Sequence, residues 1–214
     1  MKSVPDVSQL LGFWPVFILL FVTLGPIKIF GPFMQLTHDV DEGRTKQIAV
    51  RAFALAVIAA VVGGFVGKLL VENWHISPAA LTLAGGIIFL LVGLNLVLEQ
   101  YKPAHATPAA LPAAPMAAAL RVAFPMVVTP YGIAAVIALF VNSPDAARTG
   151  AILALLVAVM ALDLLAMLYA RRIMAGATIL VLQIFGAVLG VLQVALAVQM
   201  ILRGLGDLGA LAPG

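Results

Sequence analysis

Apolar stretches separated by short polar or Pro-rich segments run through the whole chain and predict six transmembrane helices. The six stretches cover about residues 10–38, 45–71, 79–98, 116–141, 148–170 and 178–202. A helix needs roughly 20 apolar residues to cross a hydrocarbon core of about 30 Å, and each stretch reaches that length. We therefore expect an all-α integral membrane protein with six transmembrane spans.

The first and fourth stretches each contain a proline near the middle, in Gly25-Pro26 and in Thr129-Pro130. Proline removes a backbone donor and clashes with the preceding turn, so helices kink or break there. The first stretch, about 43 Å long as a single helix, is also too long for an upright span. Spans 1 and 4 are therefore expected to be broken, and lipid tolerates a break only where protein or water meets the freed backbone groups.

An internal repeat relates the two halves of the chain at a constant offset. At 104 residues, Pro26 matches Pro130, Asp41 matches Asp145, Arg44 matches Arg148 and Thr45 matches Thr149. These matches are informative because the chain has only six Asp and seven Arg. Three spans in each half require opposite insertion, which predicts a 3+3 inverted repeat of the transporter type. The expected parts are repeat 1 in residues 1–102, a Pro- and Ala-rich linker in 103–115, repeat 2 in 116–206 and a tail in 207–214.

Composition supports the membrane class and excludes several others. The chain is 64% hydrophobic and 10% charged, whereas soluble domains have about 25% charged residues. No basic run accompanies the net charge of +3, so nucleic-acid binding is not expected. The absence of cysteine excludes disulfides and thiolate chemistry.

The distribution of cations predicts the orientation in the membrane. Seven Lys and Arg lie in or beside the loops after spans 1, 3 and 5, against four on the other face. By the positive-inside rule, both termini should face the periplasm.

Several motifs resemble those of the MarC family, also called SnatA-like small neutral amino-acid transporters. They are the Pro26 motif with its following polar loop, the run Leu83-Ala84-Gly85-Gly86-Ile87-Ile88 with Gly93, and Pro125 with Pro130. The resemblance implies a six-span protein of the bacterial inner membrane, and some family members move glycine, alanine and other small neutral amino acids. The chain departs from the family pattern at Gly25, where Asn is usual, at Thr129-Pro130-Tyr131, where Gly-Pro-Gly is usual, and at Lys28.

The two proline motifs are the first candidates for a substrate site. A half-helix that begins at a break presents free N–H groups and a positive dipole end, which suit a carboxylate. The alternative is that both prolines are only packing kinks. The predicted substrate-binding residues are Thr23, Gly25, Pro26, Lys28, Thr129, Pro130, Tyr131 and Gly132, with Asn95 and Gln199 from spans 3 and 6.

Two charged residues lie well inside spans, Lys28 and Asp163. A charge at that depth costs about 3 kcal/mol and needs water or a partner. We expect the two to form a charge pair or a proton-coupling site. The alternatives are that Lys28 reaches towards the interface and that Asp163 only holds span 5 in place.

The loops Asp41–Thr45 and Asp145–Thr149, with Arg44 and Arg148, are predicted to cap helices, and they could also act as gates. His38, His75 and His105 stand singly, so neither a metal site nor a cofactor is expected. All four serines lie outside the spans and no histidine lies in the interior of a span, so an enzyme is not expected.

The function predicted from the sequence is transport or export of small neutral amino acids or related solutes. Its partners are a small-molecule substrate and the lipid bilayer of the bacterial inner membrane, and a homo-oligomer is possible. The alternatives are an exporter of another small metabolite or drug, and a membrane scaffold without transport. A transporter should have an aqueous cavity lined by Gly25–Lys28 and Thr129–Gly132, whereas a scaffold should pack this region dry.

Overall fold

The computed structural model describes residues 13–99, 111–143, 145–173 and 178–210, and this part of the chain contains helices but no strand. The helices are α2 (Phe13–Leu24), α3 (Phe30–Thr37), α4 (Glu42–Asn73), α5 (Pro78–Glu99), α6 (Pro115–Arg121), α7 (Pro130–Val141), α8 (Ala146–Ile173) and α9 (Thr178–Asp207). A 3-10 turn, η1 (Pro26–Lys28), connects α2 to α3, and a π-type segment, η2 (Val122–Val127), follows α6.

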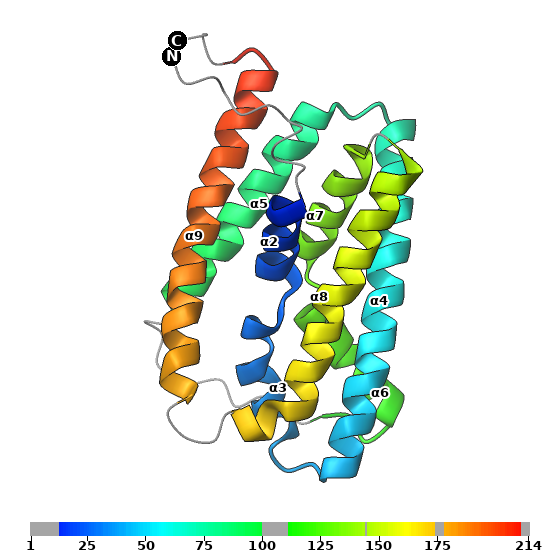
Figure 1. Ribbon diagram of the computed structural model, residues 1–214, viewed down its shortest axis with the longest axis vertical. Coiled ribbons are helices and arrows are strands. Elements are labelled where there is room, and N and C mark those ends of the chain that lie inside the picture. Colours follow the sequence, from blue (N-terminus) through cyan, green and yellow to red (C-terminus); the bar gives the residue numbers. More distant parts are fainter. Residues whose placement is uncertain (1–12, 100–110, 144, 174–177, 211–214) are drawn as a thin grey trace.

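The elements form an elongated bundle in which consecutive segments run in alternate directions (Figure 1). The broken segment α2–η1–α3 runs from the top of the view to the bottom, and α4 returns from the bottom to the top. The segment α6–η2–α7 then rises, and α8 descends in contact with α4. The helices α5 and α9 form a closely packed pair at one side of the bundle.

The first break lies where the sequence predicts it, at Gly25-Pro26. Gly25 has an extended backbone, with φ −78° and ψ 173°, and ends α2. The 3-10 turn from Pro26 closes with a hydrogen bond of 3.0 Å from the N–H of Ile29 to the oxygen of Pro26. The chain continues as α3 in the same general direction (Figure 1), so the break interrupts one pass through the bundle.

The second broken segment is irregular over a longer stretch than Pro130 alone predicts. Within η2, Phe124 has non-helical angles of φ −137° and ψ 125° ahead of Pro125. Val128 and Thr129 are extended, and α7 begins at Pro130. The helical segments before and after this break are bent by 65° relative to each other.

Small residues bring the long helices together in the core. One face of α4 carries four fully buried alanines at spacings of three or four residues, Ala49, Ala52, Ala56 and Ala60. Gly64 continues this face, and a Cβ there would come within 2.7 Å of Val136 on α7. Close helix approach through small side chains is the usual way to pack helices in membranes.

The pair formed by α5 and α9 also depends on glycine and is antiparallel. A Cβ at Gly93 would lie 3.0 Å from Val194, whereas a Cβ at Gly204, further along α9, would lie 2.8 Å from Leu83 near the start of α5. Residues later in α5 contact residues earlier in α9, so the two helices run in opposite directions.

Within the described residues, three helical segments are long and apolar enough to cross a membrane: Glu42–Asn73, Ala146–Arg172 and Gly190–Asp207. The bent pair Pro115–Val127 and Pro130–Val141 makes a fourth if it counts as one span. The sequence predicts six. The first span is divided at Gly25 into pieces of 12 and 8 residues, and in α5 only the shorter apolar stretch Pro78–Leu91 stands out.

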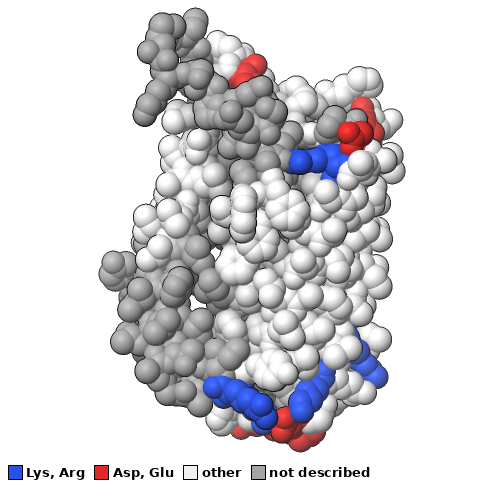
Figure 2. Space-filling model, viewed as in Figure 1, with Lys and Arg blue, Asp and Glu red and all other residues white. Residues whose placement is uncertain are grey.

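Charged side chains gather at the two ends of the bundle. Outside its grey areas, the face in Figure 2 is uncharged between a group of blue and red side chains at each end. Large apolar side chains such as Ile58, Val62 and Leu69 are exposed along α4. Such a surface suits a lipid environment and would be unusual on a soluble protein.

Candidate functional site

The two predicted breaks contact each other inside the bundle. The hydroxyl of Thr129 lies 3.4 Å from the main-chain oxygen of Thr23, to which it donates a hydrogen bond. A Cβ added to Gly132 would overlap the side chain of Leu24, the last residue of α2. The structure thus brings together segments that lie more than 100 residues apart in the sequence.

Lys28 connects the breaks through its ammonium group. Lys28 Nζ donates a hydrogen bond to the oxygen of Thr23 and lies 3.4 Å from the hydroxyl of Tyr131. It also lies 5.0 Å from the centroid of the Tyr131 ring, within the range of a cation–π interaction. Thr23 is in the last turn of α2, where carbonyls lack helical partners and a cation is favourable.

Asp163 is the buried carboxylate of the site. Its side chain on α8 is 0% exposed, and neither carboxylate oxygen has a hydrogen-bond partner. Lys28 is the charged group that interacts with it electrostatically, but the two described side chains do not form a salt bridge. A direct ion pair is thus not formed in this conformation, and the energetic coupling of Lys28 with Asp163 remains a prediction.

An unpartnered buried carboxylate is unusual, because buried polar groups are nearly always hydrogen-bonded. Inside a membrane protein, such groups are costly and mark ligand or ion pathways. The residues that pack on the same face of α8 within one turn, including Met160 and Met167, are apolar and buried. Asp163 therefore belongs to the candidate site because it is a buried carboxylate without a hydrogen-bond partner among apolar side chains.

The N-terminus of α7 is already capped within the protein. The N–H of Gly132 donates to the hydroxyl of Thr129 at 3.1 Å, and the N–H of Ile133 donates to the main-chain oxygen of Thr129 at 3.0 Å. The sequence predicts that N–H groups after Pro130 hold a substrate. For the N–H of Gly132, a ligand would have to replace the hydroxyl of Thr129.

Two cavities adjoin the first break on different sides. One, of about 490 Å³, is largely apolar and is lined by Pro26, Phe21, Phe30, Leu162, Leu165, Ala166, Tyr169 and Arg172. The other, of about 410 Å³, is lined by Lys28, Pro32, Gln35, Leu36, Arg121, Pro125 and Met126. Residues 129–132 line neither cavity, and Gly25 and Gly132 are buried. The breaks therefore meet in closed contact, with space beside them.

Of the two predicted polar residues of spans 3 and 6, only Gln199 has a described side chain, and it does not join this group. The side chain of Asn95 lies outside the described residues, and Gln199 is exposed on α9. Gln193 is the buried amide of α9, and its Nε2 donates to the oxygen of Phe89 on α5 at 3.3 Å. This bond holds the α5–α9 pair together.

Comparison with known proteins identifies the family. A family model for MarC family integral membrane proteins matches residues 10–208. The chain belongs to the MarC family. No curated protein and no solved structure matches the chain. The match confirms the resemblance drawn from the proline motifs and the Leu83–Ile88 run, and it establishes an integral membrane protein.

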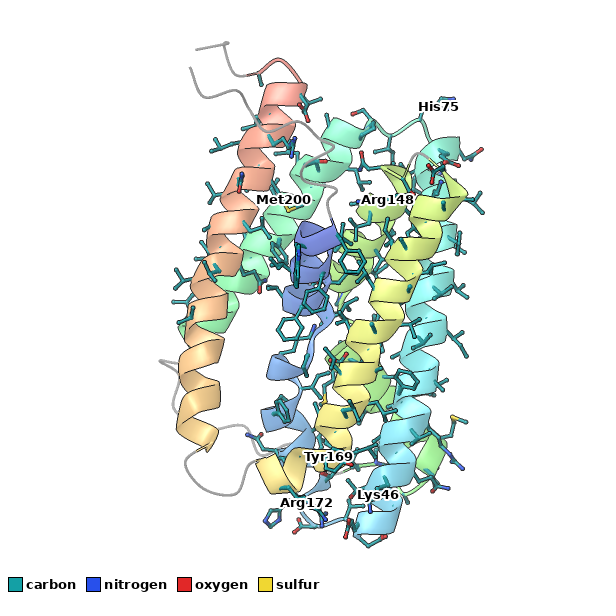
Figure 3. The ribbon with its side chains drawn as sticks, viewed as in Figure 1. Lys46, His75, Arg148, Tyr169, Arg172 and Met200 are labelled. Carbon is teal, nitrogen blue, oxygen red and sulfur yellow. The ribbon has the colours of Figure 1, made fainter. Side chains whose placement is uncertain are left out.

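This MarC family member caps α4 and α8 in the same way. The N–H of Arg44 donates to Asp41 at 2.8 Å, and the N–H of Arg148 donates to Asp145 at 2.6 Å. Each cap is an Asp that accepts from the residue three positions later. Figure 3 places Arg148 at the opposite end of the bundle from Lys46, which follows the first cap. The additional gating role of these loops remains a prediction.

Arginines of the MarC chain also fasten loops through main-chain oxygens. Arg44 donates to the oxygens of Pro112 at 3.1 Å and Ala113 at 2.7 Å. Arg171 donates to the oxygen of Thr37 at 3.0 Å and to that of Val40. The bonds of Arg171 were not predicted from the sequence, although a pair of arginines at a helix end is a recognisable feature.

Proposed function

We propose that this MarC family member is a transporter of small neutral amino acids or related small solutes in the bacterial inner membrane. The observation that carries the proposal is the contact between two broken helices beside a buried, unpartnered carboxylate, Asp163. Broken helices and intramembrane charges are costly in a membrane and recur where a solute or ion crosses it. Lys28 contacts both breaks and interacts with Asp163, which joins these features into one site.

A six-span, 3+3 inverted repeat would explain how the breaks come together. Two helices that are equivalent in such a repeat run antiparallel where they cross the pseudo-two-fold axis, as α5 and α9 do. The bond between Phe89 and Gln193 joins residues 104 apart, the offset of the sequence repeat. The matching Asp caps at opposite ends of the bundle also support this arrangement.

In the proposed orientation, both termini face the periplasm. The end of the bundle that carries Arg44, Lys46, Arg171 and Arg172 would then face the cytoplasm, as the positive-inside rule requires. Arg148 and Lys68 would lie towards the periplasm.

The closed contact between the breaks also fits a second candidate function, a membrane scaffold without transport. The space that glycine leaves at residue 132 is filled by Leu24, and Gly25 is buried. For a transporter, this packing corresponds to an occluded state, and transport requires the two breaks to separate.

Uptake of labelled glycine and alanine into proteoliposomes that contain the purified protein tests the proposal. Wild type should accumulate or exchange one of these solutes faster than empty vesicles, and Asp163→Asn should lower the rate by at least about tenfold. Arg51→Gln, a charge change on α4 at a residue that lines neither cavity, is the control and should transport normally. If wild-type vesicles behave as empty ones towards a panel of amino acids, the scaffold is the better interpretation.

A further inference from the structure

The cavity of about 410 Å³ beside the first break differs from its neighbour because two cations line it, Lys28 and Arg121. Lys28 comes from η1, and Arg121 ends α6, so two distant segments of the chain supply the charges. We infer that this cavity is a binding site for the carboxylate of a small solute, held between Lys28 and Arg121. This inference rests on the proposed transport function, which supplies the class of solute. It adds that the protein recognises the solute by its carboxylate.

The ammonium of Lys28 has donor capacity left for such a ligand. A lysine ammonium has three N–H donors and no acceptor. One donates to the oxygen of Thr23, and the contact with the hydroxyl of Tyr131, at 3.4 Å, is long. At least one donor is therefore not used by these two contacts, and Lys28 is one of the residues that line the cavity.

Arg121 adds a group whose shape suits a carboxylate. The guanidinium is planar and can donate two parallel hydrogen bonds to the two oxygens of one carboxylate. Gln35 adds an amide to the same wall. No acidic side chain is found among the described residues that line the cavity, so the charged side chains in its described lining are both cationic.

The cavity lies beside the broken helix, along η1 and α3. Its wall extends along α3 from Lys28 to Gln35 and Leu36, a rise of about 10 Å. A carboxylate near Lys28 would lie next to the break and would compete with the oxygen of Thr23 for the ammonium. Binding of an anion would thus weaken a contact within the first break.

The neighbouring cavity of about 490 Å³ does not have this character. Apart from Arg172 and the hydroxyl of Tyr169, the described residues that line it are apolar. Both exceptions lie at the C-terminal end of α8 (Figure 3). An anion is therefore better accommodated beside Lys28.

Three small molecules separate carboxylate recognition from other binding. L-Alanine has both charged groups, propionate has only the carboxylate, and L-alaninamide has only the ammonium. The thermal stability of the purified full chain in phosphatidylcholine nanodiscs would be measured with each. L-Alanine and propionate should raise the melting temperature in a saturable way, and L-alaninamide should not.

Variants then test the residues. Lys28→Met and Arg121→Gln should each weaken the binding of propionate by about tenfold or more, since each removes a charge-assisted hydrogen bond. Arg121→Lys, which keeps the charge and loses the paired donors, should give a smaller loss and replaces Arg121→Gln if that variant does not fold. Arg172→Gln should bind propionate as wild type does.

The inference is overturned if L-alaninamide stabilises the protein as well as L-alanine, or if the variants bind propionate normally. The anion in the cavity could instead be a lipid phosphate. Nanodiscs that contain phosphatidylglycerol test this source. Stabilisation by this lipid that is lost in Arg121→Gln, without any response to propionate, would assign the cavity to a lipid phosphate and also overturn the inference.

The outcome can be separated from that of the proposed function. Normal uptake of alanine in Lys28→Met and Arg121→Gln would leave transport standing and remove the carboxylate site. Specific binding of propionate without uptake of any amino acid would support the carboxylate site and contradict the proposed transport.

Discussion

Lys28 donates a hydrogen bond to the main-chain oxygen of Thr23, five residues earlier and across the break in the same chain segment. The lysine thus satisfies an oxygen at the end of α2 that the 3-10 turn at Pro26 leaves without a helical partner. The same ammonium is near Tyr131 of the second break. One side chain therefore stabilises the first break and fastens it to the second.

The first prediction concerns the coupling of Lys28 with Asp163. Lys28→Met should destabilise the wild type because it removes the cation that offsets a buried carboxylate. In an Asp163→Leu background, the same change should cost less, by about 0.5–3 kcal/mol of unfolding free energy. Reversible unfolding in detergent of the wild type, both single variants and the double variant measures this difference. Additive effects would show that the two residues are independent.

The second prediction compares two glycines on either side of Pro26. A Cβ at Gly25 would overlap the main-chain oxygen of Phe21, whereas a Cβ at Gly31 would meet nothing within 4 Å. Gly25→Ala should therefore lower the unfolding free energy by about 1–3 kcal/mol. Gly31→Ala, inside α3, should be neutral or stabilising by up to about 1 kcal/mol. Equal melting temperatures for the two variants would contradict the closed packing at the break.

The helices and the position of the first break could be predicted from the sequence because both depend on local patterns. Apolar stretches of span length and a proline after Gly25 need no knowledge of distant residues. The sequence predicts that the two breaks meet, on the hypothesis of an inverted repeat, and Thr23 and Thr129 are in contact.

Side-chain partners could not be predicted in the same way, since tertiary packing selects them. Small residues beside the breaks predict room for a solute, yet Leu24 fills the space at Gly132. The sequence predicts Asp163 as the partner of Lys28 because no other carboxylate lies well inside a predicted span, yet the ammonium of Lys28 bonds a main-chain oxygen. The cavity lined by Lys28 and Arg121 depends on how α3 lies relative to η2. No sequence motif predicts this arrangement.

The third prediction uses neighbouring arginines at the end of α8. Arg171 donates to the oxygens of Thr37 and Val40, whereas Arg172 lines an apolar cavity. Arg171→Gln should release residues 37–41 and increase their hydrogen exchange several-fold. Arg172→Gln makes the same charge change and should leave exchange in that segment unchanged. Mass-spectrometric exchange of the two variants in detergent provides the comparison, and equal protection would mean that Arg171 does not hold the segment.

The fourth prediction is the orientation of the chain. The cation-rich end should face the cytoplasm and both termini the periplasm. The chain has no cysteine, so single cysteines introduced as Ser3→Cys, Ala104→Cys and Ala210→Cys each report one position without a background. In cells with a permeabilised outer membrane, an impermeant thiol reagent should label the first and third variants. Ala104→Cys should react only after the inner membrane is disrupted, because its segment follows span 3 on the cytoplasmic side. Labelling of Ala104→Cys alone in intact inner membranes would reverse the topology, and labelling of only one terminus would require an odd number of spans.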